Sequence, residues 1–170
     1  MTQGADTGQE IVVRVAAGGD AEAIAAIYNH AVLHSTATFD LEPQTAVERR
    51  RWLMSEAVRC ALVAERGGRV IGWAALLRWS ERGAYAGTAE SSVYVAPGEQ
   101  RSGVGALLAE ALLARAPGLG LHVVIGQVCA ENAGGLALAA RLGFQRVGVL
   151  REVGLKFGRR LDVVVLQRLV

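Results

Sequence analysis

The stretch from Gln100 to Gly105 lies between an apolar strand pattern and a helical pattern, and its glycines and arginine are suited to binding an anion. The run Ser92–Val95 is β-branched and aromatic, and Pro97 ends it, whereas apolar residues from Val104 onward recur at the i, i+3, i+4 spacing of a helix. The first N–H groups of a helix have no intrahelical partner and carry the positive end of its dipole, and glycine lets a ligand approach them closely. With Arg101 adding a full charge, residues 100–105 are predicted to bind phosphate and form what we call the phosphate turn.

Two common phosphate motifs are excluded by spacing. A dinucleotide fingerprint needs G-x-G-x-x-G at the turn, and a P-loop needs Lys-Ser or Lys-Thr after its last glycine. Here the pattern is Gln100-x-x-Gly103-x-Gly105, followed by Ala106. A glycine-capped turn without a ligand remains an alternative.

Length and composition predict one domain. The chain has 170 residues with 52% hydrophobic content, so residues 11–170 are expected to form a single domain after a flexible tail, residues 1–10. That tail lacks the charged and apolar regions of a signal peptide, and no apolar run approaches the roughly 18 residues of a membrane span. A cytoplasmic protein without membrane contact is therefore expected. Cys60 and Cys129 adjoin apolar runs and are expected to be reduced core thiols.

Charge and histidine spacing predict neither nucleic-acid binding nor a metal site. The net charge is +2, and the one arginine cluster, residues 49–51, lies in a helical pattern that favours a solvated face. His30 and His34 are four residues apart on a predicted helix, but no acidic or cysteine partner completes a metal site.

The order of predicted elements is strand, two helices, three strands, helix, strand, helix and two strands. Asp20 is expected to cap the first helix, and glycines at 67 and 68 to close a hairpin. The expected helices are 20–33, 45–57, 103–115 and 132–142, and the expected strands are 11–15, 60–65, 70–79, 88–95, 122–128, 144–150 and 161–169. This order predicts one sheet covered by helices.

The Q/R-x-x-G-x-G/A pattern resembles the pyrophosphate-binding signature of the GNAT superfamily of N-acetyltransferases, and the element order matches the GNAT fold. Further segments resemble one branch, the phosphinothricin and methionine sulfoximine acetyltransferases; they are residues 27–32, 36–39, 87–95, 132–144 and 154–162. The resemblance implies an α/β (α+β) fold with a single mixed, mostly antiparallel sheet of about seven strands flanked by about four helices. It also implies acetyl transfer from acetyl-CoA to the α-amino group of a small amino-acid-like acceptor, such as phosphinothricin, methionine sulfoximine or methionine sulfone. Similar proteins are often dimers, so the resemblance also makes a homodimer possible.

Glu90 is the candidate catalytic base. An α-amino group is mostly cationic at neutral pH, so it must lose a proton before it can attack a thioester. The period-2 geometry of a strand puts Glu90, Ser92 and Tyr94 on one face, leading towards the phosphate turn. Similar enzymes are thought to use a glutamate at the matching position. An exposed strand residue, or the partner of a nearby arginine, is the alternative interpretation.

The resemblance also implies a set of cofactor contacts. Main-chain groups at Val93 and Val95 would pair with the pantetheine arm, and the late-helix asparagine, which alone would be only an N-cap, would meet the same arm. The predicted cofactor-binding residues are Val93, Tyr94, Val95, Gln100, Arg101, Ser102, Gly103, Val104, Gly105 and Asn132.

The acceptor contacts are predicted from chemistry. A carboxylate or phosphinate suits a bidentate arginine, for which Arg78 is the first candidate and Arg82 the second. Four aromatic side chains could wall the pocket, although core packing explains each equally well: Tyr28, Phe39, Trp79 and Tyr85.

Three positions depart from the branch. Relatives commonly have Tyr or His seven residues after the asparagine, where it can protonate the departing thiolate, but here that residue is Ala139. Cys129, Tyr94 and water remain open as replacements. Ser91 and Arg160 stand where the branch often has His and Trp. Two other functions therefore stay open: an acetyltransferase for a protein N-terminus or polyamine, and a CoA-binding module that has lost catalysis.

Overall fold

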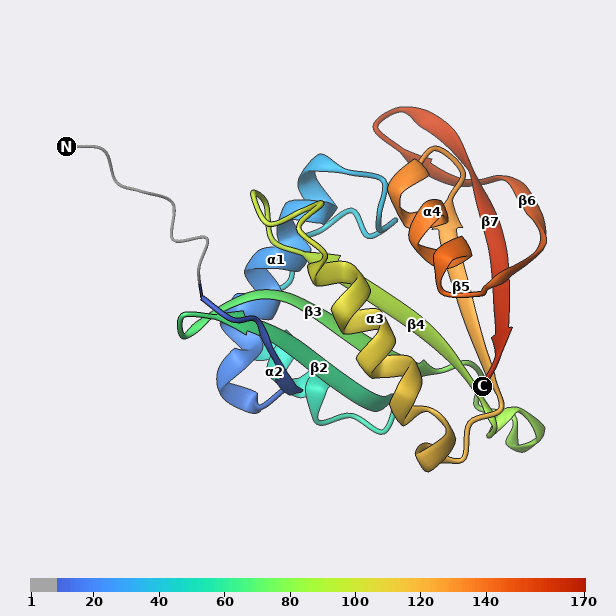
Figure 1. Ribbon diagram of the computed structural model, residues 1–170. Coiled ribbons are helices and arrows are strands. Elements are labelled where there is room, and N and C mark those ends of the chain that lie inside the picture. The colour runs from blue at the N-terminus through green and yellow to red at the C-terminus, as the bar shows by residue number, and fades with distance from the viewer. Residues whose placement is uncertain (1–8) are drawn as a thin grey trace.

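The computed structural model describes residues 9–170, in which seven strands form one twisted sheet with helices on both faces (Figure 1). The strands are β1 (Val12–Val15), β2 (Val58–Arg66), β3 (Arg69–Arg78), β4 (Thr88–Val95), β5 (Val123–Cys129), β6 (Gln145–Lys156) and β7 (Arg159–Leu169), and the helices are α1 (Ala21–His34), α2 (Ala46–Leu53), α3 (Val104–Arg115) and α4 (Ala133–Arg141). Of the predicted tail 1–10, residues 1–8 lie outside the described residues.

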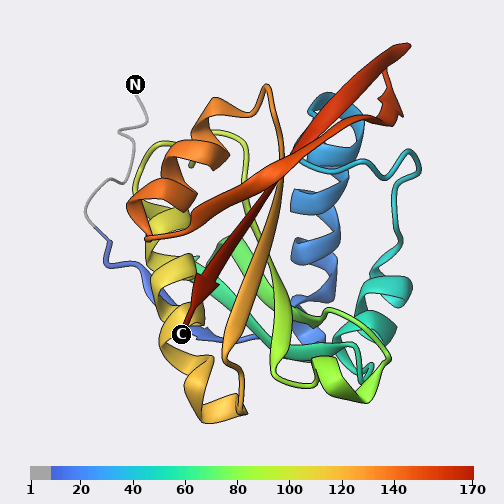
Figure 2. The ribbon, with the colours of Figure 1, turned by 90° about the vertical axis from the view of Figure 1, so that its right-hand side faces the viewer.

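The sheet order is β1-β2-β3-β4-β5-β7-β6, and only the β4–β5 pair is parallel. The predicted fold class is confirmed. In Figure 2, α3 and α4 cover one face of the sheet and α1 and α2 cover the other. Alternate residues of β2 serve the two cores: Leu62 belongs to the apolar cluster under α3, and Val63 to the cluster under α1. Because both faces are covered, β2 and β3 are apolar almost throughout rather than alternating.

The second helix is shorter than predicted. It begins where predicted, and Thr45 caps it: the Thr45 hydroxyl accepts the Glu48 N–H at 3.2 Å while the Glu48 carboxylate accepts the Thr45 N–H at 2.7 Å. However, α2 ends at Leu53 instead of Ala57. The N–H and hydroxyl of Ser55 both donate to the Trp52 carbonyl, which closes the helix with a turn.

The interpretation of residues 49–51 as a solvated face is wrong for Arg49. This side chain is only 4% exposed, and its guanidinium lies 3.8 Å from the centre of the Tyr28 ring, with Trp52 and Trp73 also within cation–π range. Burial lowers the pKa of Arg49. Arg49 is the buried residue of α2, so its side chain supplies the surface that packs against α1.

The sixth strand is longer than predicted, because β6 continues past Leu150 to Lys156. The polar pair Arg151-Glu152 interrupts the strand pattern in the sequence, but in the structure it forms a bulge. Glu152 has a φ of 56°, and its N–H donates to the Asp162 carboxylate at 2.8 Å. The two-residue turn from Phe157 to Gly158 then joins β6 to β7.

Asp20 precedes α1 as predicted, but its side chain does not cap that helix. Its carboxylate accepts two hydrogen bonds from Arg14, at 2.8 and 2.9 Å, and one from the Ala17 N–H at 2.7 Å. These bonds lower the pKa of Asp20 and tie β1 to the start of α1. Among the described residues, no helix has the length and apolar character needed to cross a membrane.

Candidate active site

The sheet opens into a wedge between β4 and β5. Their parallel ladder ends at the pair Glu90–Ile125, although β4 continues to Val95 and β5 to Cys129 (Figure 1). The Ala96 N–H donates to the Ile71 carbonyl at 2.8 Å, so even-numbered residues of β4 direct their main-chain groups towards β3. The N–H and C=O groups of Val93 and Val95 therefore face the wedge.

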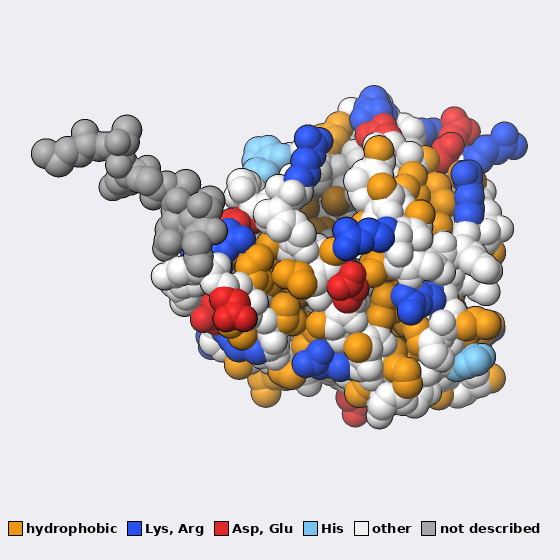
Figure 3. All heavy atoms as spheres, in the orientation of Figure 1, with side chains coloured by type: hydrophobic (Ala, Val, Ile, Leu, Met, Phe, Trp, Pro, Cys, Tyr) orange, Lys and Arg blue, Asp and Glu red, His pale blue; other side chains and the backbone are white. Residues whose placement is uncertain are grey.

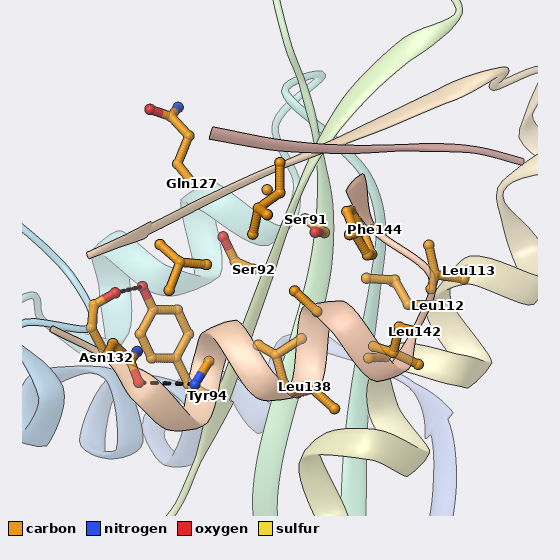
Figure 4. Close-up of a pocket in the computed structure, with 18 residues that line it drawn as sticks. Ser91, Ser92, Tyr94, Leu112, Leu113, Gln127, Asn132, Leu138, Leu142 and Phe144 are labelled. Carbon is orange, nitrogen blue, oxygen red and sulfur yellow. Dashed lines mark hydrogen bonds between the residues drawn. The ribbon is translucent and has the colours of Figure 1, made fainter. Parts of the chain in front are cut away.

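A cavity of about 130 Å³ fills the wedge and lies under α3 and α4 (Figure 4). Ser91, Ser92 and Asn132 supply polar atoms to its lining, and Leu112, Leu113, Leu138, Leu142 and Phe144 form apolar walls; Gln127 also lines it, but its amide points away from the other lining side chains. Of the cofactor residues predicted, Val93, Tyr94 and Asn132 line this cavity. Exposed main-chain groups on β4 beside apolar walls suit an extended arm that carries amides.

The phosphate turn has the predicted backbone. Gly103 precedes α3 with a φ of 86°, which favours glycine, and Arg101 is also left-handed with a φ of 62°. The first helical hydrogen bond of α3 runs from the Leu107 N–H to the Gly103 carbonyl, so the N–H groups of Val104, Gly105 and Ala106 precede the ladder. The turn is exposed from Gln100 to Gly103. Its geometry suits a solvent-accessible diphosphate.

Glu90 lies half-buried where β4 and β5 begin to diverge. It faces the α1 side of the sheet, as its antiparallel neighbour Leu77 does. The Gln127 amide donates to the Glu90 carboxylate at 3.3 Å. Burial raises the pKa of Glu90, and this hydrogen bond partly opposes the increase. A carboxylate with a raised pKa is suited to accept a proton near neutral pH.

Gln127 was missed by sequence reasoning. It is an exposed polar residue in an otherwise apolar strand, β5, and it points to the same face as Glu90. That interruption of the apolar run was the available signal, but only the register of β4 against β5 shows which residue it meets.

Asn132 caps α4, because its side-chain oxygen accepts the Gly135 N–H at 3.0 Å, and it also lines the cavity. Ala139, where relatives commonly have an acid, lines the cavity as well. Of the two side chains suggested as replacements, Tyr94 lines the cavity and donates to the Ala37 carbonyl at 3.3 Å, and burial raises its pKa. Cys129 is buried at the end of β5, outside the described lining.

The predicted acceptor residues are less concentrated. Tyr28 lies on α1, and its ring is buried in the core between this helix and the sheet. Its hydroxyl lies 2.8 Å from the Thr38 hydroxyl and donates to the Asp40 carboxylate at 2.6 Å. Phe39, in the α1–α2 loop, packs its ring against Gly154 of β6. Trp79 and Tyr85 are 37% and 44% exposed. None of these four aromatic residues is among the described residues that line the cavity.

The two candidate arginines differ in position. Arg78 lies opposite Ala89 in the β3–β4 ladder, and Ala89 packs in the apolar cluster under α3. The Arg78 side chain therefore points to the α3 face of the sheet, away from Glu90. Its guanidinium already meets Glu81 at 2.8 Å and Glu56 at 3.9 Å. Arg82 is exposed in the loop that leads to β4.

Comparisons with known proteins decide the family. The sequence model of the acetyltransferase (GNAT) family matches residues 24–144. A phosphinothricin N-acetyltransferase of Streptomyces coelicolor is 38% identical, with 94% of this chain and 96% of that protein covered. The chain belongs to the GNAT family. An L-methionine sulfoximine/L-methionine sulfone acetyltransferase of Pseudomonas aeruginosa is 35% identical, covering 91% of this chain and 92% of that protein.

Solved structures agree with this assignment. The yncA acetyltransferase of Salmonella typhimurium, solved with its cofactor acetyl-CoA, has a TM-score of 0.90 and 34% identity over 94% of this chain and 93% of its own. The chain is therefore an acetyl-CoA-dependent N-acetyltransferase, as the signature turn predicted. Within the described range, no group of three or more His, Cys, Asp or Glu residues is placed to hold a metal ion.

Proposed function

We propose that this GNAT enzyme acetylates the α-amino group of small amino-acid-like acceptors of the phosphinothricin, methionine sulfoximine or methionine sulfone type. The observation that carries the proposal is Glu90, a half-buried carboxylate with a raised pKa at the head of the wedge. The similar proteins named for phosphinothricin and methionine sulfoximine supply the acceptor class.

The proposed cofactor contacts follow the wedge and the turn. Acetyl-CoA supplies the acetyl thioester. The main-chain groups of Val93 and Val95 would hold its pantetheine arm, with Tyr94 and Asn132 beside it, since these groups face or line the cavity. The turn residues would hold the pyrophosphate: Gln100, Arg101, Ser102, Gly103, Val104 and Gly105.

Glu90 would take the proton from the acceptor ammonium, directly or through a water. The freed nitrogen lone pair forms the new N–C bond to the acetyl carbon, the C–S bond breaks with its electron pair on sulfur, and the second proton leaves the nitrogen for this thiolate or for water. A CoA thiol is acidic enough to leave as thiolate, so Ala139 slows this step without forbidding it. Gln127 would hold the Glu90 carboxylate towards the acceptor side.

The acceptor anion is assigned to an arginine near the β3–β4 connection. Arg82 is favoured over Arg78, because Arg78 already pairs with two glutamates and faces away from Glu90. Trp79 and Tyr85 flank Arg82 in sequence and expose aromatic surface on which an acceptor side chain could pack. Tyr28 and Phe39 would act indirectly, by fixing the α1–α2 loop.

The test is an amine panel. Acetyl-CoA is titrated by calorimetry, and free thiol is then followed with methionine sulfoximine, phosphinothricin, a polyamine and a peptide with a free N-terminus. The proposal expects thiol release that is fastest with the two amino-acid analogues. Faster release with the polyamine or peptide would support those acceptors instead, and binding without turnover on any amine would indicate a module that has lost catalysis.

A homodimer remains a prediction, with a second copy meeting β6. This strand is one of the two edge strands of the sheet, and it exposes Val147, Leu150, Val153 and Leu155. A long apolar edge strand is a ready pairing surface. Light scattering is expected to give twice the mass of the chain, and Val153→Lys to reduce it; a wild-type monomer at micromolar concentration would contradict the dimer.

A further inference from the structure

Glu99 comes directly before the phosphate turn, and its side chain is only 12% exposed. Its carboxylate accepts hydrogen bonds from two arginines of the β2–β3 hairpin, from Arg66 at 2.6 Å and from Arg69 at 2.7 Å. Charge-assisted bonds of this length are stronger than those between neutral groups. Glu99 therefore ties the turn to a hairpin that is far from it in sequence.

The two arginines lie directly opposite each other across the hairpin, as the last residue of β2 and the first of β3. Like charges at facing positions repel each other. Because the Glu99 carboxylate contacts both, it offsets this repulsion and keeps the hairpin end and the turn together.

The turn itself has an unusual backbone that needs outside support. Gly98, Arg101 and Gly103 all have left-handed φ values, 84°, 62° and 86°. Arg101 is not glycine, so its conformation is strained and persists only where the surroundings hold it. The side chains from Gln100 to Ser102 are exposed, and the Ser102 hydroxyl donates back to the Glu99 carbonyl. Glu99 is thus the buried attachment of an otherwise solvent-facing turn.

We infer that Glu99 is a positioning residue for the donor: by clamping the turn to the β2–β3 hairpin, it aims the N–H groups at the start of α3 towards the CoA pyrophosphate. This rests on the proposed role of residues 100–105. The clamp acts only on donors that carry a pyrophosphate. It leaves the acetyl group, the pantetheine arm and the acceptor side untouched.

The test compares Glu99→Gln with wild type on two donors, acetyl-CoA and S-acetylpantetheine, which lacks the pyrophosphate. The variant is expected to raise KM for acetyl-CoA about tenfold with kcat unchanged, the effect of losing one or two charge-assisted hydrogen bonds. Kinetics with S-acetylpantetheine should stay at wild-type values. Glu99→Asp should recover part of the acetyl-CoA affinity, and Arg66→Met combined with Glu99→Gln should cost less than the sum of the single changes.

Glu65→Gln is the matched control. Glu65 lies on the same hairpin and pairs with Arg14 instead of the turn, so its loss should leave both donors unaffected. Unchanged or tighter acetyl-CoA binding by Glu99→Gln would overturn the clamp, and so would an equal loss with both donors. If Gly103→Val also left acetyl-CoA affinity unchanged, the failure would lie in the turn as the pyrophosphate site.

Discussion

The two sides of the β4–β5 wedge differ in the groups that they offer to a ligand: mainly main-chain groups on one side and side chains on the other. On the proposed donor side, under α3 and α4, the surfaces are main-chain groups of β4, the exposed start of a helix and aliphatic walls (Figure 4). On the acceptor side, the candidates are long side chains from loops and strand ends, such as Arg82, Trp79 and Tyr85. A site made of main-chain groups tolerates changes of side chain, so cofactor binding can be predicted from the fold. The choice of acceptor depends on individual side chains.

The charged side chains also differ from one another, because some are scattered over the surface and others form short ion pairs. On the face that carries α3 and α4, arginine side chains stand apart, with neutral and apolar atoms between them (Figure 3). The charges that the structure concentrates are instead paired at short range: Arg14 with Asp20 and Glu65, and Glu99 with the arginines of the β2–β3 hairpin.

The largest expected effect comes from Glu90→Gln. Loss of a general base should lower kcat by about 10²- to 10⁴-fold, while acetyl-CoA affinity stays near wild type, because the donor contacts are elsewhere. Wild-type kcat/KM should fall as pH drops through the raised pKa of Glu90, since protonated Glu90 cannot accept a proton. The variant should lack this acidic decline. Stopped-flow thiol release over pH, with calorimetry for the donor, measures both, and an unchanged profile removes Glu90 from the mechanism.

Gly103→Val should mainly damage the donor side. A β-branched residue in the left-handed region costs roughly 1–2 kcal/mol or more, so the turn should shift and acetyl-CoA affinity should fall by at least about tenfold. Calorimetry gives the affinity, and circular dichroism checks folding. Gly148→Val, at a glycine without left-handed φ and with no atom within 4 Å of its added Cβ, is the control. A folded Gly103→Val that binds acetyl-CoA normally would contradict the assignment of the turn.

Arg82→Ala should affect only the acceptor side. Loss of a bidentate carboxylate contact is expected to raise KM for methionine sulfoximine about tenfold, with KM for acetyl-CoA unchanged. Arg78→Ala is the paired comparison and should have little effect, because that guanidinium is already engaged by Glu81. Initial rates over both substrate concentrations distinguish them. The opposite ranking would return the anion contact to Arg78.

Gln127→Leu should give the smallest change. Its amide stabilises the charged form of Glu90, so its removal should raise the pKa of that carboxyl and move the acidic limb of kcat/KM to higher pH by less than about one unit. The rate on the plateau at high pH should remain within a few-fold of wild type, since the base itself is intact. A shift to lower pH would show that Gln127 does not donate to Glu90.

Sequence reasoning was most successful where local rules decide. The start of α3 at Gly103, the glycine hairpin and the run of strands each depend on neighbouring residues, and each is present. The family followed from the turn and the element order together. The error at Arg49 came from long-range packing: this residue is buried because α2 lies against aromatic rings from α1 and β3, which no pattern within α2 reveals.

The site divides in the same way. Strand alternation placed Glu90 and Tyr94 on one face, which the register confirms, but the register also turns Arg78 to the other face. The Gln127–Glu90 contact and the clamp at Glu99 join residues at least thirty positions apart, so only the tertiary structure brings them together. Roles for all of these residues remain predictions for the experiments above.

The proposed reaction is transfer of an acetyl group to an α-amino group. Methionine sulfoximine tests this within one molecule, because it carries two nitrogens that could react. Nuclear magnetic resonance of the product formed from acetyl-CoA and methionine sulfoximine locates the new amide. We expect acetylation of the α-nitrogen, and Glu90→Gln should slow this reaction almost to zero. Acetylation of the sulfoximine nitrogen, or no product while acetyl-CoA is bound, would contradict it.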